Sequence, residues 1–147
     1  MLSRPLPTLQ ATEHLAATLA TRVRRGDAIL LSGPLGTGKS ALARAFLRAL
    51  TNNPTLDVPS PTFTLVQTYD TPCGPVHHFD LWRLTGPGAM TELGWDDATG
   101  DIVLVEWPDR LGPLTPPDAL TLTLRATGDD SREVTLEGWP DRLEQLA

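Results

Sequence analysis

A glycine-rich segment near the start of the chain, GPLGTGKS at residues 33–40, most constrains how this protein can fold. It matches the pattern G-x-x-x-x-G-K-[ST] at every required position. An apolar run of strand length, residues 28–32, precedes it, and ALARAFLRAL at 41–50 follows it with apolar residues at helical spacing. Glycines let such a loop bring its backbone N–H groups against phosphate oxygens, and the following helix adds its N-terminal dipole. The order of strand, glycine-rich turn and helix therefore predicts a P-loop (Walker A) site for a nucleoside triphosphate.

The lysine of this segment is unusual in the composition of the chain. Lys39 is the single lysine among 12 basic residues. A compact ammonium on a flexible stem fits between the β- and γ-phosphates, where a planar guanidinium would not. Because the lysine is already used here, the guanine-reading segment N-K-x-D is impossible, and we expect ATP rather than GTP.

Two acidic residues follow apolar runs and are candidates for the acid that orders Mg²⁺ beside the Ser40 hydroxyl. Glu106 follows the run Ile102–Val105, and Asp80 ends the segment VHHFD. Either carboxylate could hold the metal or polarise the attacking water, and either could instead cap the next turn. Since both stand on strands that could flank the strand before the loop, the functional interpretation is favoured.

The remaining patterns predict a single α/β domain over residues 1–147, with a mixed central sheet flanked by helices. Residues 12–24 have helical spacing with Thr12 as a candidate N-cap, and Ile102–Val105 is typical of a central strand. Two hairpins are expected, one from residues 63–69 with 76–82 and one from residues 119–126 with 132–138. Short helical turns are expected at 86–99, and a short closing helix at 139–146.

Composition excludes several classes of protein. A net charge of −6 argues against a primary nucleic-acid binder, which needs a basic face. No apolar run approaches the length of a transmembrane helix, and the N-terminus lacks the apolar core of a signal peptide. A single cysteine, Cys73, cannot form an internal disulfide, a zinc ribbon or an iron–sulfur cluster. We therefore expect a cytoplasmic protein that does not bind membranes. His77 and His78 alternate faces of a strand, so at most one faces the site, and structural roles are favoured for both.

Several short segments, in their order and separation, resemble the TsaE (YjeE) family of small bacterial ATPases over most of the chain. They are GPLGTGKSALARAF, SPTFTLVQTY at 60–69, HFDLWRL at 78–84, ELGWDD at 92–97 and VEWPDR at 105–110. The resemblance implies an ATP-binding protein that acts in making threonylcarbamoyladenosine at adenosine 37 of tRNA. It also implies association with the TsaD–TsaB complex, with tRNA contacted only through that complex.

The resemblance further implies roles for individual residues, in addition to ATP and Mg²⁺ as ligands. Ser40, which replaces the more usual threonine, and Glu106 would bind Mg²⁺, Asp80 would be catalytic, and Thr62 would sense the γ-phosphate. Trp82 stands where the family often has tyrosine. The residues expected to hold phosphate are Gly33, Gly36, Thr37, Gly38, Lys39, Ser40 and Ala41. The residues expected near the nucleoside are Leu9, Thr12 and Arg132.

Two other functions remain open at this point. A small-molecule kinase also begins with strand, P-loop and helix, but residues 86–100 carry only acidic charges where an arginine-rich lid would be expected. A nucleotide-gated binding module without useful hydrolysis is the third possibility. No arginine in the sequence is an evident finger, and a finger supplied in trans can raise phosphoryl transfer by roughly 10³- to 10⁵-fold. We therefore expect slow hydrolysis by the chain alone.

Overall fold

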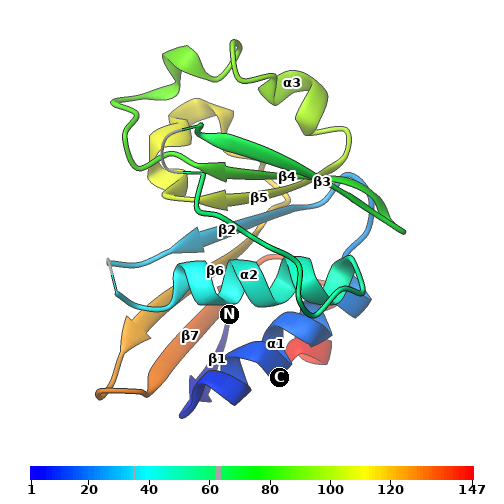
Figure 1. Ribbon diagram of the computed structural model, residues 1–147. Helices are drawn as coiled ribbons and strands as arrows, with labels where there is room; N and C mark the ends of the chain where they lie inside the picture. Colours follow the sequence, from blue (N-terminus) through cyan, green and yellow to red (C-terminus); the bar gives the residue numbers. More distant parts are fainter. Residues whose placement is uncertain (35, 62–63) are drawn as a thin grey trace.

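The strand before the glycine-rich loop lies at the centre of a mixed sheet (Figure 1). The computed structural model describes residues 1–34, 36–61 and 64–147. Within these residues the strands are ordered β1-β7-β6-β2-β5-β4-β3. The strands are β1 Leu2–Leu6, β2 Ala28–Ser32, β3 Val66–Thr71, β4 Gly74–Asp80, β5 Ile102–Glu106, β6 Leu120–Ala126 and β7 Arg132–Glu137. The helices are α1 Leu9–Arg22, α2 Lys39–Leu50 and α3 Trp95–Ala98, with 3₁₀ turns η1 Pro87–Ala89, η2 Pro108–Leu114 and η3 Leu143–Leu146.

Four neighbouring strands in the middle of the sheet, β6, β2, β5 and β4, run parallel to one another. The hairpins β3–β4 and β6–β7 and the pair β1–β7 are antiparallel. β5 is buried along its whole length, as expected for a strand that is covered on both faces. Because parallel strands share one direction, their carboxyl ends meet at one edge of the sheet, where ligands bind in open α/β folds.

Helices cover both faces of the sheet. On one face, α1 and α2 pack through Leu15 and Phe46 against residues that include Leu31 and Leu104. On the other face, α3 and η2 cover the strands, and the Trp95 ring meets Phe79 edge-on at 5.2 Å between centroids. Along the central strands β2 and β5, successive apolar residues alternate between these two cores, which places the sheet between two layers of helices (Figure 1). No helix in the described part of the chain is long and apolar enough to cross a bilayer.

The predicted α/β class, both hairpins and the central strand are confirmed. The expected N-cap is wrong. α1 begins at Leu9, before the expected start near Thr12. Thr8 is its N-cap, and the Thr8 hydroxyl accepts a hydrogen bond from the Ala11 N–H at 3.2 Å. Thr12 instead lies buried inside the helix. Both threonines precede apolar residues at helical spacing, so the pattern alone did not separate them.

Strand β1 was not predicted from the sequence, and the proline in its sequence LSRPL argues against a strand. The structure shows why Pro5 is tolerated there. Among the described strands, β1 pairs only with β7 and lies at the edge of the sheet, so a residue that lacks an N–H need not break a ladder on both sides. The closing helix is also shorter than residues 139–146, since it covers only Leu143–Leu146.

Candidate functional site

The glycine-rich loop joins β2 to α2 at the carboxyl edge of the parallel strands. Glu106 ends β5, the direct neighbour of β2, and lies in register with Leu31. Asp80 ends β4 and lies in register with Glu106, one strand further away. The expectation that both acids stand on strands flanking β2 is therefore correct for Glu106 only, since the other neighbour of β2 is β6. The two carboxylates still come to the same edge because β2, β5 and β4 are parallel.

Two glycines of the loop take conformations that other residues would not tolerate. Gly33 has a φ of 134°, and a Cβ there would lie 2.5 Å from the backbone oxygen of Leu124. Gly38 has a φ of 94° and is the N-cap residue of α2. With glycine at the cap, no side chain there occupies the first N–H groups of the helix, which are then available to an anion.

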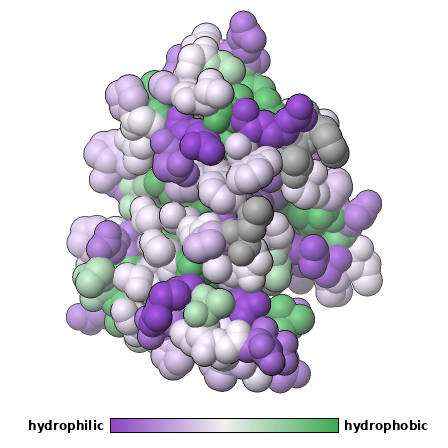
Figure 2. Space-filling view, turned by 90° about the vertical axis from the view of Figure 1, so that its left-hand side faces the viewer, coloured by the Kyte–Doolittle hydropathy of each residue, from purple (hydrophilic) through white to green (hydrophobic). Residues whose placement is uncertain are grey.

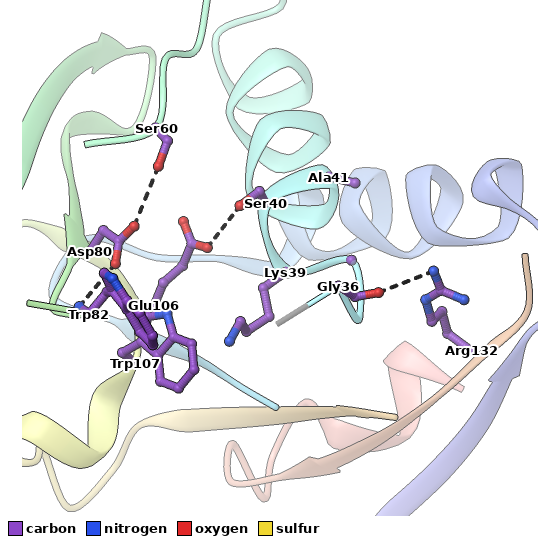
Figure 3. Close-up of a pocket in the computed structure, with 11 residues that line it drawn as sticks. Gly36, Lys39, Ser40, Ala41, Ser60, Asp80, Trp82, Glu106, Trp107 and Arg132 are labelled. Carbon is purple, nitrogen blue, oxygen red and sulfur yellow. Dashed lines mark hydrogen bonds between the residues drawn. The ribbon is translucent and has the colours of Figure 1, made fainter. Parts of the chain in front are cut away.

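A cavity of about 570 Å³ opens beside the loop (Figure 3). Most of the predicted site residues meet there: Gly36, Gly38, Lys39, Ser40, Ala41, Asp80, Glu106 and Arg132. Residues from β4, β5, α2 and β7 thus line one cavity. Arg132 Nη2 donates a hydrogen bond to the Gly36 backbone oxygen at 3.3 Å, although the two residues are 96 positions apart in the sequence.

Oxygen ligands are placed on one side of this cavity. The Ser40 hydroxyl donates to Glu106 Oε1 at 3.2 Å. Asp80 accepts a hydrogen bond from the Trp82 backbone N–H at 3.1 Å and another from the Ser60 hydroxyl at 3.4 Å. Hydroxyl and carboxylate oxygens suit Mg²⁺, which is commonly held by one or two protein oxygens together with phosphates and water. Ser40 and Glu106 are therefore chemically suited to hold this ion.

Behind the cavity, Glu106 contacts a buried histidine. Its Oε2 lies 2.7 Å from His78 Nε2, and the two side chains are 3% and 2% exposed. Although structural roles were favoured for both histidines, His78 thus touches a candidate site residue. His77 lies in another environment, where its Nε2 is 3.1 Å from Asp101 Oδ2.

Lys39 is the charged centre of the loop. Its ammonium donates to the Gly33 carbonyl and lies 3.6 Å from the centroid of the Trp107 ring, a cation–π contact. Burial lowers the pKa of Lys39, and the negative charges of Glu106, Asp80 and Asp109 partly offset this effect. These carboxylates compensate only part of the cost of burying the ammonium, and a phosphate group would supply further negative charge.

A second cavity of about 460 Å³ adjoins the first and shares Gly38, Ala41 and Arg132 with it. Leu9 and Thr12 also line it, so the three residues expected near the nucleoside lie together. Thr8 and Asp130 complete its lining, and no sequence pattern had indicated them.

Three of the predicted site residues do not line either cavity in the described structure or cannot be placed: Gly33, Thr37 and Thr62. Gly33 and Thr37 belong to the loop but line neither cavity, and the buried Thr37 hydroxyl donates to the Pro34 carbonyl at 2.7 Å. Thr62 lies outside the described residues. Ser60 and Trp107 also line the first cavity, although neither was among the predicted site residues; each belongs to a segment that had been singled out, SPTFTLVQTY and VEWPDR respectively.

Figure 2 looks onto the edge of the sheet where the parallel strands end. Hydrophilic residues cover most of this face, and hydrophobic residues are visible only in small separate areas. A polar face of this kind is compatible with a charged ligand.

The chain is similar in sequence to proteins of one family. The family model described as "Threonylcarbamoyl adenosine biosynthesis protein TsaE" matches residues 6–134. A TsaE protein of Rickettsia felis is 34% identical over 124 residues, which cover 84% of this chain and 72% of the relative. A TsaE protein of Bacillus subtilis is 31% identical over 139 residues, covering 93% of this chain and 85% of the relative. Both relatives are described as tRNA threonylcarbamoyladenosine biosynthesis proteins.

The fold also matches a solved structure. The crystal structure of Bacillus subtilis YdiB superimposes with a TM-score of 0.76 at 27% sequence identity, covering 99% of this chain and 90% of that one. The similarity thus extends over the sheet, the loop and the helices that cover them.

Proposed function

Because this chain belongs to the TsaE family of threonylcarbamoyladenosine biosynthesis proteins, we propose that it binds ATP and hydrolyses it slowly in this tRNA modification. The observation that carries the proposal is the meeting of Lys39, Ser40 and Glu106 at one cavity, at the N-terminus of α2. A lysine, a hydroxyl and a carboxylate in this arrangement match the needs of a triphosphate with its metal ion.

Each residue has a defined part in this proposal. The backbone N–H groups of residues 36–41 bind phosphate oxygens, and the Lys39 ammonium leaves the Gly33 carbonyl to neutralise the β- and γ-phosphates. Ser40 and Glu106 would hold Mg²⁺, which neutralises charge on the phosphates when it is bound. The remaining space of the second cavity, beside Leu9, Thr12 and Arg132, receives the nucleoside.

Asp80 is the proposed base for the attacking water. Its carboxylate faces the cavity and is oriented by the Trp82 N–H and the Ser60 hydroxyl (Figure 3). A carboxylate held in this way accepts a hydrogen bond from water and orients it for attack. Thr62, from the same SPT segment as Ser60, is proposed to sense the γ-phosphate.

Partner proteins are proposed to complete the site. Arg132 is the one arginine among the described residues that line the first cavity, and its guanidinium is engaged with the Gly36 carbonyl. We propose that residues 1–147 act as one cytoplasmic ATPase domain, and that the TsaD–TsaB complex supplies what hydrolysis lacks. With a net charge of −6, the chain contacts tRNA only through that complex.

The test compares ATPase rates of the wild type and Lys39→Ala, with and without TsaD–TsaB. We expect Lys39→Ala to abolish ATP binding, and we expect the complex to stimulate the wild type at least about tenfold, since groups supplied in trans can do far more. Lys39→Arg is the matched control, because it keeps the charge but places a planar guanidinium where the ammonium fits. Rapid turnover by the chain alone, unchanged by the complex, would contradict the proposal.

A further inference from the structure

We propose that His78 is a positioning residue for Glu106, which it holds so that only one carboxylate oxygen faces the phosphate cavity. This inference rests on the proposed function, because it concerns how Glu106 meets a metal–nucleotide ligand. His78 precedes Asp80 by two residues on β4, so the two side chains point to the same face of the sheet. Its Nε2 lies 2.7 Å from Glu106 Oε2 on the neighbouring strand.

The direction of this hydrogen bond follows from the surroundings of the ring. A carboxylate oxygen only accepts hydrogen bonds, so His78 Nε2 carries the proton and donates. His78 Nδ1 is buried, and no group among the described residues is its hydrogen-bond partner. A proton on Nδ1 would therefore be buried without an acceptor, which is costly. The burial of the ring thus favours the tautomer that donates to Glu106.

This hydrogen bond divides the two oxygens of Glu106 between different tasks. Oε2 is engaged by His78 behind the cavity, while Oε1 accepts from the Ser40 hydroxyl at 3.2 Å beside it. Glu106 therefore presents a single oxygen, next to the second candidate metal ligand. In metalloproteins, partners of this kind orient the ligand and contribute to metal affinity.

The same contact restrains Glu106 from a competing interaction. The charges of Glu106 and Lys39 already attract each other across the cavity, as the opposing effect of Glu106 on the lysine pKa shows. Without the histidine, the carboxylate is free to turn toward the ammonium and occupy the space of the phosphates. His78 thereby keeps the Glu106 carboxylate away from the Lys39 ammonium, so that both groups remain available to a metal–nucleotide ligand.

The experiment measures ATP affinity by calorimetry, as a function of Mg²⁺ concentration and in the presence of a chelator. The variants are His78→Leu, which removes the donor, and His78→Gln, whose side-chain amide keeps an N–H near the position of Nε2. His77→Gln is the matched control on the adjacent residue, which lies outside both cavities. His78→Asn, with an amide too short to reach Glu106, replaces the leucine variant should that variant not fold.

We expect His78→Leu to raise the Mg²⁺ concentration for half-maximal ATP binding by about 10- to 100-fold. The affinity in chelator should stay near that of the wild type, and His78→Gln should restore most of the Mg²⁺ response. An unchanged Mg²⁺ requirement, or an equal loss with and without Mg²⁺ that glutamine does not rescue, would overturn the inference. If the wild type itself did not bind ATP, the proposed function would fail instead.

Discussion

Two consecutive residues of β4, His77 and His78, each contact a carboxylate, yet the two pairs lie in different environments. The side chains of His78 and Glu106 are 2% and 3% exposed. Glu106 Oε1 accepts a hydrogen bond from the Ser40 hydroxyl, and both Glu106 and Ser40 line the first cavity. The His77–Asp101 pair is 19% and 17% exposed and lies outside both cavities. A histidine with a carboxylate partner thus forms a part of the candidate site on one face of a strand and a partly exposed contact on the other.

The difference arises from the partners of each group. Asp101 also binds Arg25 at 2.9 Å, and His77 Nδ1 lies 3.2 Å from the Thr68 hydroxyl, so the polar atoms of that pair are largely satisfied. His78 Nδ1, in contrast, is buried without a partner in the part of the chain that the structure describes. The polar atoms around Asp101 are thus held in a surface network, whereas the Glu106 carboxylate is held between a buried histidine and a hydroxyl that lines the cavity. Burial and neighbouring groups, rather than the presence of a histidine beside a carboxylate, therefore separate the two roles.

The largest expected difference between the two pairs is in the ATPase rate, when the carboxylate of each pair is neutralised in turn. Glu106→Gln should lower the ATPase rate by about 10²-fold or more, because it removes the negative charge that would hold Mg²⁺ beside Ser40. Asp101→Asn, the matched change in the other pair, should leave the rate unchanged. Both rates are measured in the presence of TsaD–TsaB. Equal losses in the two variants would contradict the distinction, and intact tRNA modification by Glu106→Gln would favour a nucleotide-gated module without useful hydrolysis.

A smaller contrast is expected in the free energy of unfolding. His78→Leu should lower it by about 1.5–3 kcal/mol, because a buried hydrogen bond to a charged group is lost. His77→Leu should lower it by less, since its pair is partly solvated. Urea unfolding at neutral pH gives both values, provided that the two variants share one m-value. A larger loss for His77→Leu would reverse the assignment of the buried and the surface pair.

The smallest effect is expected in acid. The hydrogen bond from His77, together with the hydrogen bond and charge of Arg25, lowers the pKa of Asp101 below its usual value of 3.8. A lowered pKa means that the folded state favours the carboxylate, so its stabilisation is complete above pH 3.8 and is lost as the pH falls through the folded-state pKa. Asp101→Asn should therefore flatten the acid limb of a plot of unfolding free energy against pH. An unaltered acid limb would show that the contacts of Asp101 contribute nothing to stability.

Local patterns in the sequence were sufficient for the central elements of the fold. The buried strand β2 was predicted with the bounds that the structure has, Ala28–Ser32, because a short apolar run before a glycine-rich turn has few alternatives. The N-cap of α1 and the edge strand β1 were not, because Thr8 and Thr12 carry the same local signal and Pro5 argues against a strand. For β1, the deciding contact is the pairing with β7, which lies far away in the sequence.

The candidate site divides in the same way. Glu106 and Asp80 could be singled out because an acid at the end of an apolar run is visible in the sequence. Ser60 and His78 could not be assigned to the site, because their contacts with Asp80 and Glu106 join segments 20 and 28 positions apart. Nor does alternation along β4 say which of two adjacent histidines faces α2.

The sequence by itself therefore determined the glycine-rich loop between β2 and α2, its single lysine and the α/β class, because these are visible in runs of residues that are adjacent in the chain. Tertiary structure alone decided the strand order that brings Glu106 beside β2 and places Asp80 one strand further away. It also decided which histidine meets which acid, because the pairing of strands sets every such contact. Strands β2, β5 and β4 are not joined by tight turns, so their order and register are set by which apolar faces pack together in the folded sheet, not by the residues of any one strand.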